Sequence, residues 1–459
     1  MNGFRIEHDS MGEMRVPDSA LYGASTARAV ENFPVSGRRA PRALIQALGW
    51  IKQAGAEVNR SLGLLDAEKA SAIADAAMRV AAGELDGEFV VDIFQTGSGT
   101  STNMNANEVI SHLASQSLPT KKVHPNDDVN MCQSSNDVFP SAVHIAVKGG
   151  LENTLAPALD RLERALTAKA GEFANVLKSG RTHLQDAVPI SLGQEFSGYA
   201  AQVAQVRRRL LQAALWVADL PLGGTAVGTG VNAHPEFAAR AIDRVSGLSG
   251  LTLRAADNRF AAQACPDALV DASAALRSTA LALMKVANDL RWLASGPTAG
   301  LAEIRLPAVQ PGSSIMPGKV NPVIAESLLM VCAAVVGNDA TVATAAQWSN
   351  FELHTMWPLL ADRLLESIDT LAAAADNFAV RLVAGVEADR QRCEDLLVYN
   401  PSVATVLAPS LGYDKVAAYV HDALARGERV LQPGDDEQTY KVAGERVDRA
   451  LLTGPRNSD

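Results

Sequence analysis

The fold is indicated first by residues 269–290, which read LVDASAALRSTALALMKVANDL. Leucine recurs at seven-residue intervals in this stretch, with a small or apolar residue within each interval. The leucines are Leu269, Leu276, Leu283 and Leu290, and Ala272, Thr279 and Val286 lie between them. Because such a repeat keeps one helix face against neighbouring helices, the stretch predicts a long helix packed in a bundle.

A second apolar stripe extends the same pattern towards the N-terminus. After Asp137 it consists of Leu151, Leu155, Leu159, Leu162 and Leu166, spaced by three or four residues as on one face of a helix. Further helical patterns follow Pro322 and Pro358. We therefore expect a mainly α protein, with a central helical bundle at 137–393. An N-terminal domain at 1–136 and a C-terminal domain at 394–459 would flank it.

Composition and charge exclude several classes of function. The chain has 41 basic and 51 acidic side chains in 459 residues, so its net charge of −10 carries no footprint of nucleic-acid binding. Its four cysteines lie far apart without a C-x-x-C pair, which argues against a zinc site, an iron–sulfur motif or a disulfide framework. With no apolar signal core and no run of eighteen apolar residues, we expect a soluble cytoplasmic protein without metal, cofactor or membrane contact.

Residues 312–326, GSSIMPGKVNPVIAE, have the composition of a site for a small anion. Gly312 and Gly318 bracket two serines and allow a sharply bent loop that can close as a lid. Asn321 followed by Pro322 reads as the N-cap and first residue of a helix, whose free N–H groups would bind a carboxylate beside Lys319. The alternative is a plain Gly/Pro turn ahead of a core helix.

This segment resembles the signature of the fumarase/aspartase superfamily, and most closely that of class II fumarases. Five more segments resemble the same family in the same order: GSGTSTNMN at 97–105, HPND at 124–127, SSND at 134–137, GRTHLQD at 180–186 and GGTAVGTG at 223–230. The resemblance implies the L-aspartase-like fold, with a central long-helix bundle and two smaller end domains. It also implies a homotetramer whose active sites are shared between subunits and that hydrates fumarate to L-malate, a step of the tricarboxylic acid cycle.

The resemblance assigns three catalytic residues. His183 would activate water, since an imidazole exchanges protons near neutral pH, and Glu326 would orient its ring. Ser313 would remove the carbon-bound proton as an alkoxide, favoured by Lys319 and loop N–H groups in a dry pocket. The resulting aci-carboxylate carbanion needs preorganised hydrogen-bond donors.

The binding residues follow from the same resemblance. For the substrate carboxylates they are Ser98, Gly99, Thr100, Ser134, Ser135, Asn136, Thr182, Ser314, Lys319, Val320 and Asn321. A secondary anion site would comprise His124, Pro125, Asn126 and Asp127, although these residues also read as a simple Pro-Asn turn. Residues 105–108, NANE, resemble a capping box and predict a donor-rich helix entrance.

Two other readings stay open. Aspartases usually carry glutamine at the position of His183, so the imidazole favours hydration, yet Val323-Ile324 is shared with aspartase-like sequences. His354 also replaces an asparagine that is usual in fumarases. An aspartate ammonia-lyase or a related C4-dicarboxylate lyase is therefore the alternative enzyme. A catalytically silent helical protein is the alternative of a different class. The joint presence of five residues argues against it, namely His183, Ser313, Lys319, Asn321 and Glu326.

Overall fold

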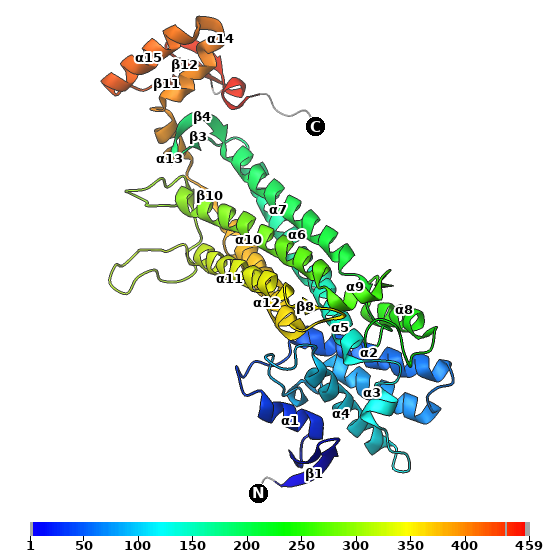
Figure 1. The fold of residues 1–459 in the computed structure, drawn as a ribbon. Coiled ribbons are helices and arrows are strands. Elements are labelled where there is room, and N and C mark those ends of the chain that lie inside the picture. The colour runs from blue at the N-terminus through cyan, green and yellow to red at the C-terminus, as the bar shows by residue number, and fades with distance from the viewer. Residues whose placement is uncertain (1–2, 437, 455–459) are drawn as a thin grey trace. The chain divides into compact units, whose positions relative to one another are not determined.

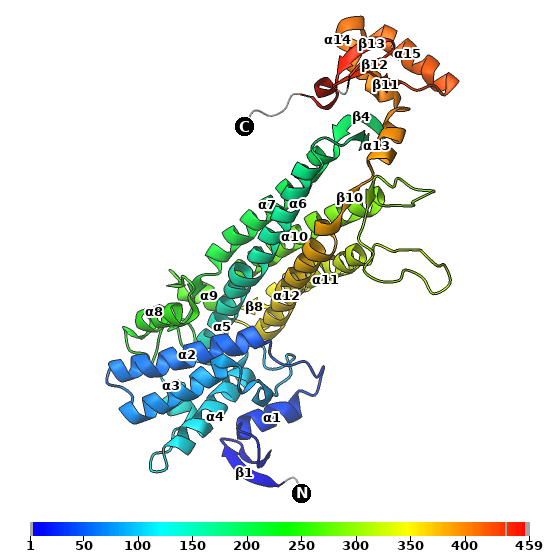
Figure 2. The same cartoon turned by 180° about the vertical axis from the view of Figure 1, so that it is seen from behind.

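The computed structural model describes residues 3–436 and 438–454 (Figures 1 and 2). These group into two compact units. The first unit comprises Met1–Pro157, Val206–Ala280 and Val331–Ala372, and the second comprises Ala158–Gln205, Leu281–Met330 and Ala373–Asp459. The boundaries of these units differ from the domain boundaries expected from the sequence, at 137 and 393. That domain division stays a prediction.

Short helices and a hairpin make up much of the first unit. Its hairpin pairs β1 (Phe4–Asp9) with β2 (Gly12–Pro17), and α1 (Ala24–Asn32), α2 (Arg42–Ser61), α3 (Ala67–Ala82), η1 (Asp86–Glu88) and α4 (Thr100–Ser117) follow. Next come η2 (Pro125–Val129) and α5 (Ser135–Gly149), then β5 (Asp219–Leu220), α8 (Phe237–Ser249), β6 (Arg254–Ala255), α9 (Arg259–Ala264), β8 (Ser349–Asn350) and β9 (Leu353–His354). Helix α2 packs against α3, α5 and α8, as Figure 1 shows, and α3 packs against α4.

The second unit contains three small antiparallel sheets. They are the hairpin of β3 (Leu177–Thr182) and β4 (Gln185–Ser191), the pair β7 (Ile304–Arg305) and β10 (Glu387–Ala388), and the sheet β11 (Leu431–Pro433), β12 (Thr439–Val442) and β13 (Glu445–Asp448). Its shorter helices are η4 (Val383–Gly385), α13 (Arg390–Leu397), η5 (Pro401–Leu407), α14 (Ala408–Leu411), α15 (Tyr413–Arg426) and η6 (Arg449–Thr453). Helix α13 packs on β3, and η5 packs on β4.

The predicted long helices are present. They are α6 (Ala156–Glu172), which continues α5 through η3 (Gly150–Leu155), and α7 (Leu192–Trp216), α10 (Asp267–Leu293), α11 (Val323–Ala346) and α12 (Trp357–Arg381). Every leucine of the two predicted stripes is at most 1% exposed. The period of the sequence therefore identified the buried faces correctly, and the mainly α architecture is confirmed.

Polar side chains fix how these helices lie against one another inside each unit. In the first unit, Asp339 of α11 accepts hydrogen bonds from Ser273 Oγ at 2.7 Å and Arg277 Nη1 at 2.6 Å, both on α10. In the second unit, Arg161 of α6 donates both arms of its guanidinium to Asp376 of α12, at 2.7 and 2.6 Å. Such directional contacts set the helix register, which apolar packing alone leaves loosely specified.

Helix α11 has apolar surface on more than one face. Ala325, Leu328, Cys332 and Val335 are buried at helical spacing, whereas Met330 is 68% exposed. By length and composition α11 is the one helix among the described residues that would suffice to cross a membrane, and only 39% of its most apolar window is buried in this chain. Core helices of soluble proteins can be equally long and apolar.

Two buried histidines flank Trp357 in the first unit. The ring centroid of His354 lies 5.1 Å from that of Trp357, and the ring of His144 lies at 6.3 Å. His144 Nδ1 donates to Val217 O at 3.1 Å, and neither imidazole Nε2 has a hydrogen-bond partner in the part of the chain that the structure describes. Burial lowers the pKa of each histidine to about 4. Both rings are therefore held neutral.

This pair predicts acid-sensitive stability. Because the folded pKa lies below the ordinary value of 6.5, the unfolded chain binds more protons between about pH 4 and 6.5. Acidification from pH 7 to 5 should then lower the free energy of unfolding by about 2 kcal/mol per histidine. His354→Asn should remove one such contribution in urea titrations at the two pH values, whereas the exposed His421→Asn should leave the difference unchanged. An unchanged difference in His354→Asn would contradict this account.

Candidate active site

Two of the predicted substrate-binding segments meet in the first unit. Ser98 Oγ lies 2.8 Å from Thr100 Oγ1, which lies 2.7 Å from Ser135 Oγ. These three hydroxyls form a continuous hydrogen-bonded chain across residues distant in sequence. Both helices that follow begin here, α4 at Thr100 and α5 at Ser135, so free N–H groups accompany the hydroxyls. Such a cluster suits an anion.

Close packing explains the glycine between Ser98 and Thr100. Gly99 has φ 76°, and a Cβ atom on it would lie 2.2 Å from the ring of Phe139. Any side chain at this position would therefore push α4 away from α5. The glycine lets the two helix starts approach closely.

The capping-box reading of residues 105–108 is wrong. Helix α4 already begins at Thr100, so these residues lie inside it. Glu108 instead reaches the start of α1, where its carboxylate accepts hydrogen bonds from the backbone N–H groups of Gly23, Ser25 and Thr26 at 2.9 to 3.1 Å. Glu108 does cap a helix, but the helix is α1 rather than one that begins at residue 105, because a carboxylate can cap a helix distant in sequence.

A buried carboxylate fixes the start of α5. Ser134 is its N-cap, and Asp137 closes the capping box by accepting from Ser134 N at 2.9 Å. The other Asp137 oxygen accepts from the N–H groups of Gly223 and Thr225 at 2.8 and 3.0 Å. Burial raises the pKa of Asp137 to about 6, although these donors oppose the shift. Nearby Asn136 donates its amide to Ala226 O at 2.8 Å.

His183 lies at the tip of the β3–β4 hairpin in the second unit. Thr182 pairs with Gln185, so His183 and Leu184 form a two-residue loop, and their φ angles are 57° and 60°. Positive φ at both central residues is typical of a type I′ turn, which normally uses asparagine and glycine. Two residues with bulky side chains here indicate local strain, a feature that clusters at functional sites.

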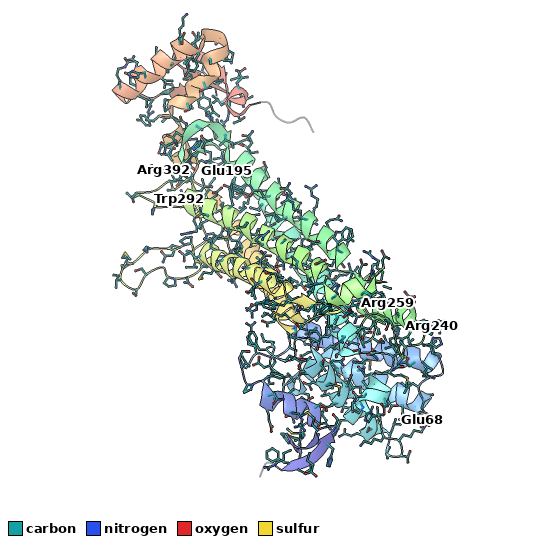
Figure 3. The ribbon with its side chains drawn as sticks, viewed as in Figure 1. Glu68, Glu195, Arg240, Arg259, Trp292 and Arg392 are labelled. Carbon is teal, nitrogen blue, oxygen red and sulfur yellow. The ribbon has the colours of Figure 1, made fainter. Side chains whose placement is uncertain are left out.

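A cavity of about 450 Å³ adjoins this turn. His183 lines it together with Glu195 and Tyr199 of α7 and Asp289 and Trp292 of α10. Figure 3 labels Glu195 and Trp292 on these two helices. Tyr199 donates its hydroxyl to Asp289 at 3.1 Å, and burial raises the pKa of the Glu195 carboxyl.

The serine segment forms a compact turn. Ser313 Oγ accepts hydrogen bonds from the backbone N–H groups of Ile315 at 3.2 Å and Met316 at 3.0 Å. The amide of Asn321 donates to Gly312 O at 2.6 Å and closes the loop. Helix α11 begins at Val323, so Asn321 joins the loop ends rather than serving as the predicted N-cap. Two N–H groups aimed at one hydroxyl oxygen favour its ionised form.

His183 and Ser313 line separate cavities of the second unit. Ser313 and Lys319 line one of about 440 Å³ formed by residues 308–313 and 316–320, while His183 lines the cavity beside α7 and α10. Thr182, His183, Ser314, Lys319 and Val320 are exposed, and Asn321 is half-buried. Glu326 lies in the first turn of α11, and no hydrogen bond among the described residues joins it to His183. The roles assigned to these residues stay predictions.

The segment predicted as a secondary anion site forms the one-turn helix η2. His124 Nδ1 accepts hydrogen bonds from the N–H groups of Asn126 and Asp127 at 3.3 and 3.1 Å, with Pro125 in the first turn. The imidazole is thus a local cap. Anion binding there stays a prediction.

In the described part of the chain, no group of three or more His, Cys, Asp or Glu side chains is placed to hold a metal ion.

Sequence reasoning missed the charges beneath the hairpin. Glu303 is fully buried and accepts from both Nη atoms of Arg181, at 2.8 and 2.9 Å. Lys178, also fully buried, lies 3.3 Å from Glu303. Arg181 belongs to a recognised motif, but Glu303 lies 122 positions away in the chain and outside every motif. Only the fold reveals this pairing.

Comparison with known proteins shows the family of this chain. A family model described as lyase matches residues 12–337, and the chain belongs to this lyase family. Within it, the chain belongs with the class II fumarate hydratases. It is 51% identical to the enzyme of that name from Mycobacterium tuberculosis over 451 residues, covering 98% of this chain and 95% of the relative. The Corynebacterium glutamicum enzyme of the same name is 49% identical over 452 residues, with coverage of 98% and 95%.

Solved structures give the same result. The class II fumarase from Schistosoma mansoni superposes with a TM-score of 0.91 at 39% identity, covering 93% of this chain and 94% of that one. A fumarate lyase:delta crystallin structure from Brucella melitensis bound to cobalt gives a TM-score of 0.90 at 47% identity, with coverage of 93% and 94%. The predicted fumarase/aspartase fold is therefore confirmed.

Proposed function

We propose that this protein is a fumarate hydratase that interconverts fumarate and L-malate. The observation that carries the proposal is His183, held at a cavity by a strained hairpin turn. Water must lose a proton as its oxygen bonds to carbon, and an imidazole accepts that proton near neutral pH. Ammonia needs no such activation, so the imidazole favours a hydratase over an ammonia-lyase.

Ser313 is proposed to handle the carbon-bound proton. In dehydration its alkoxide removes the proton beside a carboxylate, and the electron pair moves into that carboxylate to give the aci-carboxylate. Loss of hydroxide, protonated by His183, then forms the alkene. The N–H groups of Ile315 and Met316 already point at Ser313 Oγ, and Lys319 adds positive charge in the same segment. Glu326 is proposed to orient His183.

The carboxylates are proposed to be held by two sets of donors that different subunits would contribute. The hydroxyl chain of Ser98, Thr100 and Ser135 would supply one set, with Gly99, Ser134 and Asn136 beside it. Thr182, Ser314, Lys319, Val320 and Asn321 would supply the other set. Electrostatic catalysis needs these donors in a site from which water is excluded.

We infer that a homotetramer supplies this exclusion. His183, Thr182 and Lys319 are exposed in a single chain, and α11 keeps an apolar second face. Packing of further copies against these surfaces would bury both and combine site residues from different subunits. Light scattering after gel filtration should give four times the 48.3 kDa chain mass. A stable monomer with full activity would contradict the shared site.

A single optical assay tests the proposed function. Loss of the fumarate absorbance should proceed without ammonium and should persist after treatment with a chelator. Strict dependence on ammonium would identify an aspartate ammonia-lyase instead, and inertness towards every C4-dicarboxylate would indicate a structural protein. Loss of activity on chelation, restored by added metal, would overturn the metal-independent mechanism.

We also propose that the protein acts in the cytoplasm, in the tricarboxylic acid cycle. Its four cysteines are free thiols, three of them buried, which suits a reducing compartment. Fractionation of cells should find the hydratase activity in the soluble fraction. Recovery outside the cytoplasm would contradict this proposal.

A further inference from the structure

A group of four charged side chains, two fully buried and two half-buried, lies at the hairpin that carries His183. Lys178 and Glu303 are both fully buried, 3.3 Å apart, and Lys178 also lies 3.2 Å from Glu195. Arg181 meets Glu303 through a two-pronged pair at 2.8 and 2.9 Å. Two basic and two acidic side chains thus share one site, and each has a partner of opposite charge.

Stability alone is a poor explanation for this group. Taking paired charges out of water costs about as much as their attraction returns, and apolar replacements are often as stable. The group instead fixes the orientation of its side chains, because a guanidinium and a carboxylate paired at two points allow one relative orientation only. Arg181 is two residues before His183, so fixing the position of Arg181 also restricts the position of the turn.

The hairpin needs such a constraint because its turn is strained. His183 and Leu184 both have positive φ, a backbone conformation that residues with a side chain adopt only under strain. A strained turn persists only where the surrounding structure determines it. Asn400 supplies part of that support, since its amide donates to Ser179 Oγ on β3 at 3.0 Å and to Ala187 O on β4 at 2.7 Å.

Glu303 is itself held rigidly. Its N–H donates to Leu293 O at 2.8 Å, and its carbonyl accepts from Asp389 N at 2.9 Å. Arg392, labelled in Figure 3, donates to the carbonyls of Gly300 and Leu301 at 3.0 and 2.9 Å and so fixes the approach to Glu303. The carboxylate is therefore presented to Arg181 from a backbone anchored on both sides.

We propose that Glu303 is a positioning residue for the hydration reaction. Its carboxylate, acting through Arg181, holds the β3–β4 hairpin so that the imidazole of His183 meets the substrate in one orientation. The inference rests on the proposed function, because it assumes that His183 is the group that activates water. Glu303 itself touches no substrate.

Kinetics of Glu303→Gln give the first test. The substitution keeps the shape of the side chain and removes its charge, so kcat should fall by about 100-fold, as expected for a misplaced catalytic group, with little change in KM. Asp376→Asn is the matched control, since it breaks the two-pronged pair with Arg161 in the same unit and should leave kcat unchanged. A rise in KM with unchanged kcat, or an equal loss in both variants, would overturn the proposal.

A double-mutant cycle separates positioning from general damage. In a His183→Asn background, Glu303→Gln should cause little further loss, since the group that it positions is already gone. If the two substitutions lowered kcat by independent factors that multiply in the double variant, the proposal would be contradicted.

Hydrogen exchange gives a readout that does not depend on activity. In Glu303→Gln the amides of residues 181–186 should exchange faster, whereas those of β12 and β13 should not change. If the parent protein fails to hydrate fumarate, the proposed function fails, but this measurement still tests the support of the hairpin. Unchanged exchange at 181–186 would refute the inference. Should Glu303→Gln not fold, Arg181→Lys keeps the charge and loses the two-pronged geometry, and the same outcomes apply.

Discussion

His183→Asn should lower kcat by roughly 10²–10⁴-fold, the usual loss when an acid–base group is removed, with little change in KM. Asparagine keeps a polar side chain and tolerates the positive φ of 57° at this turn, so the hairpin should be preserved. Steady-state kinetics with fumarate, at several pH values, measures the effect. Only the group that exchanges protons with water is lost, and dicarboxylate binding should survive.

Exposed Leu184 offers the matched control for that variant. It shares the turn and its positive φ, and its side chain is 71% exposed. Leu184→Asn should therefore leave kcat nearly unchanged. If His183→Asn and Leu184→Asn had the same small effect, the imidazole would have no part in the chemistry.

Ser313→Ala should cause a comparable loss in kcat, about 10²–10⁴-fold, for a different reason. The N–H groups of Ile315 and Met316 would lose the oxygen that they now contact, and no base would remain for the carbon-bound proton. Ser314→Ala should act mainly on KM, raising it about tenfold through a lost hydrogen bond to a charged group. Equal kcat in Ser313→Ala and the parent would exclude Ser313 as the base.

Solvent exchange distinguishes these two losses. Incubating L-malate in deuterated water reports removal of the carbon-bound proton, independently of loss of water. His183→Asn should retain this exchange, because it still forms the aci-carboxylate, whereas Ser313→Ala should abolish it. The opposite pattern would reverse the two assignments.

Much of the fold was predictable because it depends on local periodicity. The seam through Leu269, Leu276, Leu283 and Leu290 is set by side-chain spacing along one helix, and every member proved to be buried. By contrast, the sequence placed a capping box at residues 105–108, where Glu108 in fact caps α1. A carboxylate three residues from a capping position carries no information about which backbone it will reach in space.

The candidate site was predictable in composition but not in arrangement. Segment resemblance selected Ser98, Ser135 and Ser313, and the structure adds contacts that no motif specifies, such as the hydroxyl chain through Thr100. Glu303 was not predicted from the sequence, because its role depends on its pairing with Arg181, which lies 122 positions away in the chain. Likewise, separate cavities for His183 and Ser313 follow from three-dimensional packing.

Complementation between inactive variants tests the central claim most directly. In this experiment, His183→Asn and Ser313→Ala subunits are unfolded, mixed in equal amounts and reassembled. If His183 and Ser313 act on one substrate from different copies of the chain, some of the mixed tetramers should contain intact sites. Half of the subunits carry each intact residue, so roughly a quarter of the parental activity should return. Activity no higher than that of the separately treated variants, in tetramers proven to be mixed, would contradict the shared site.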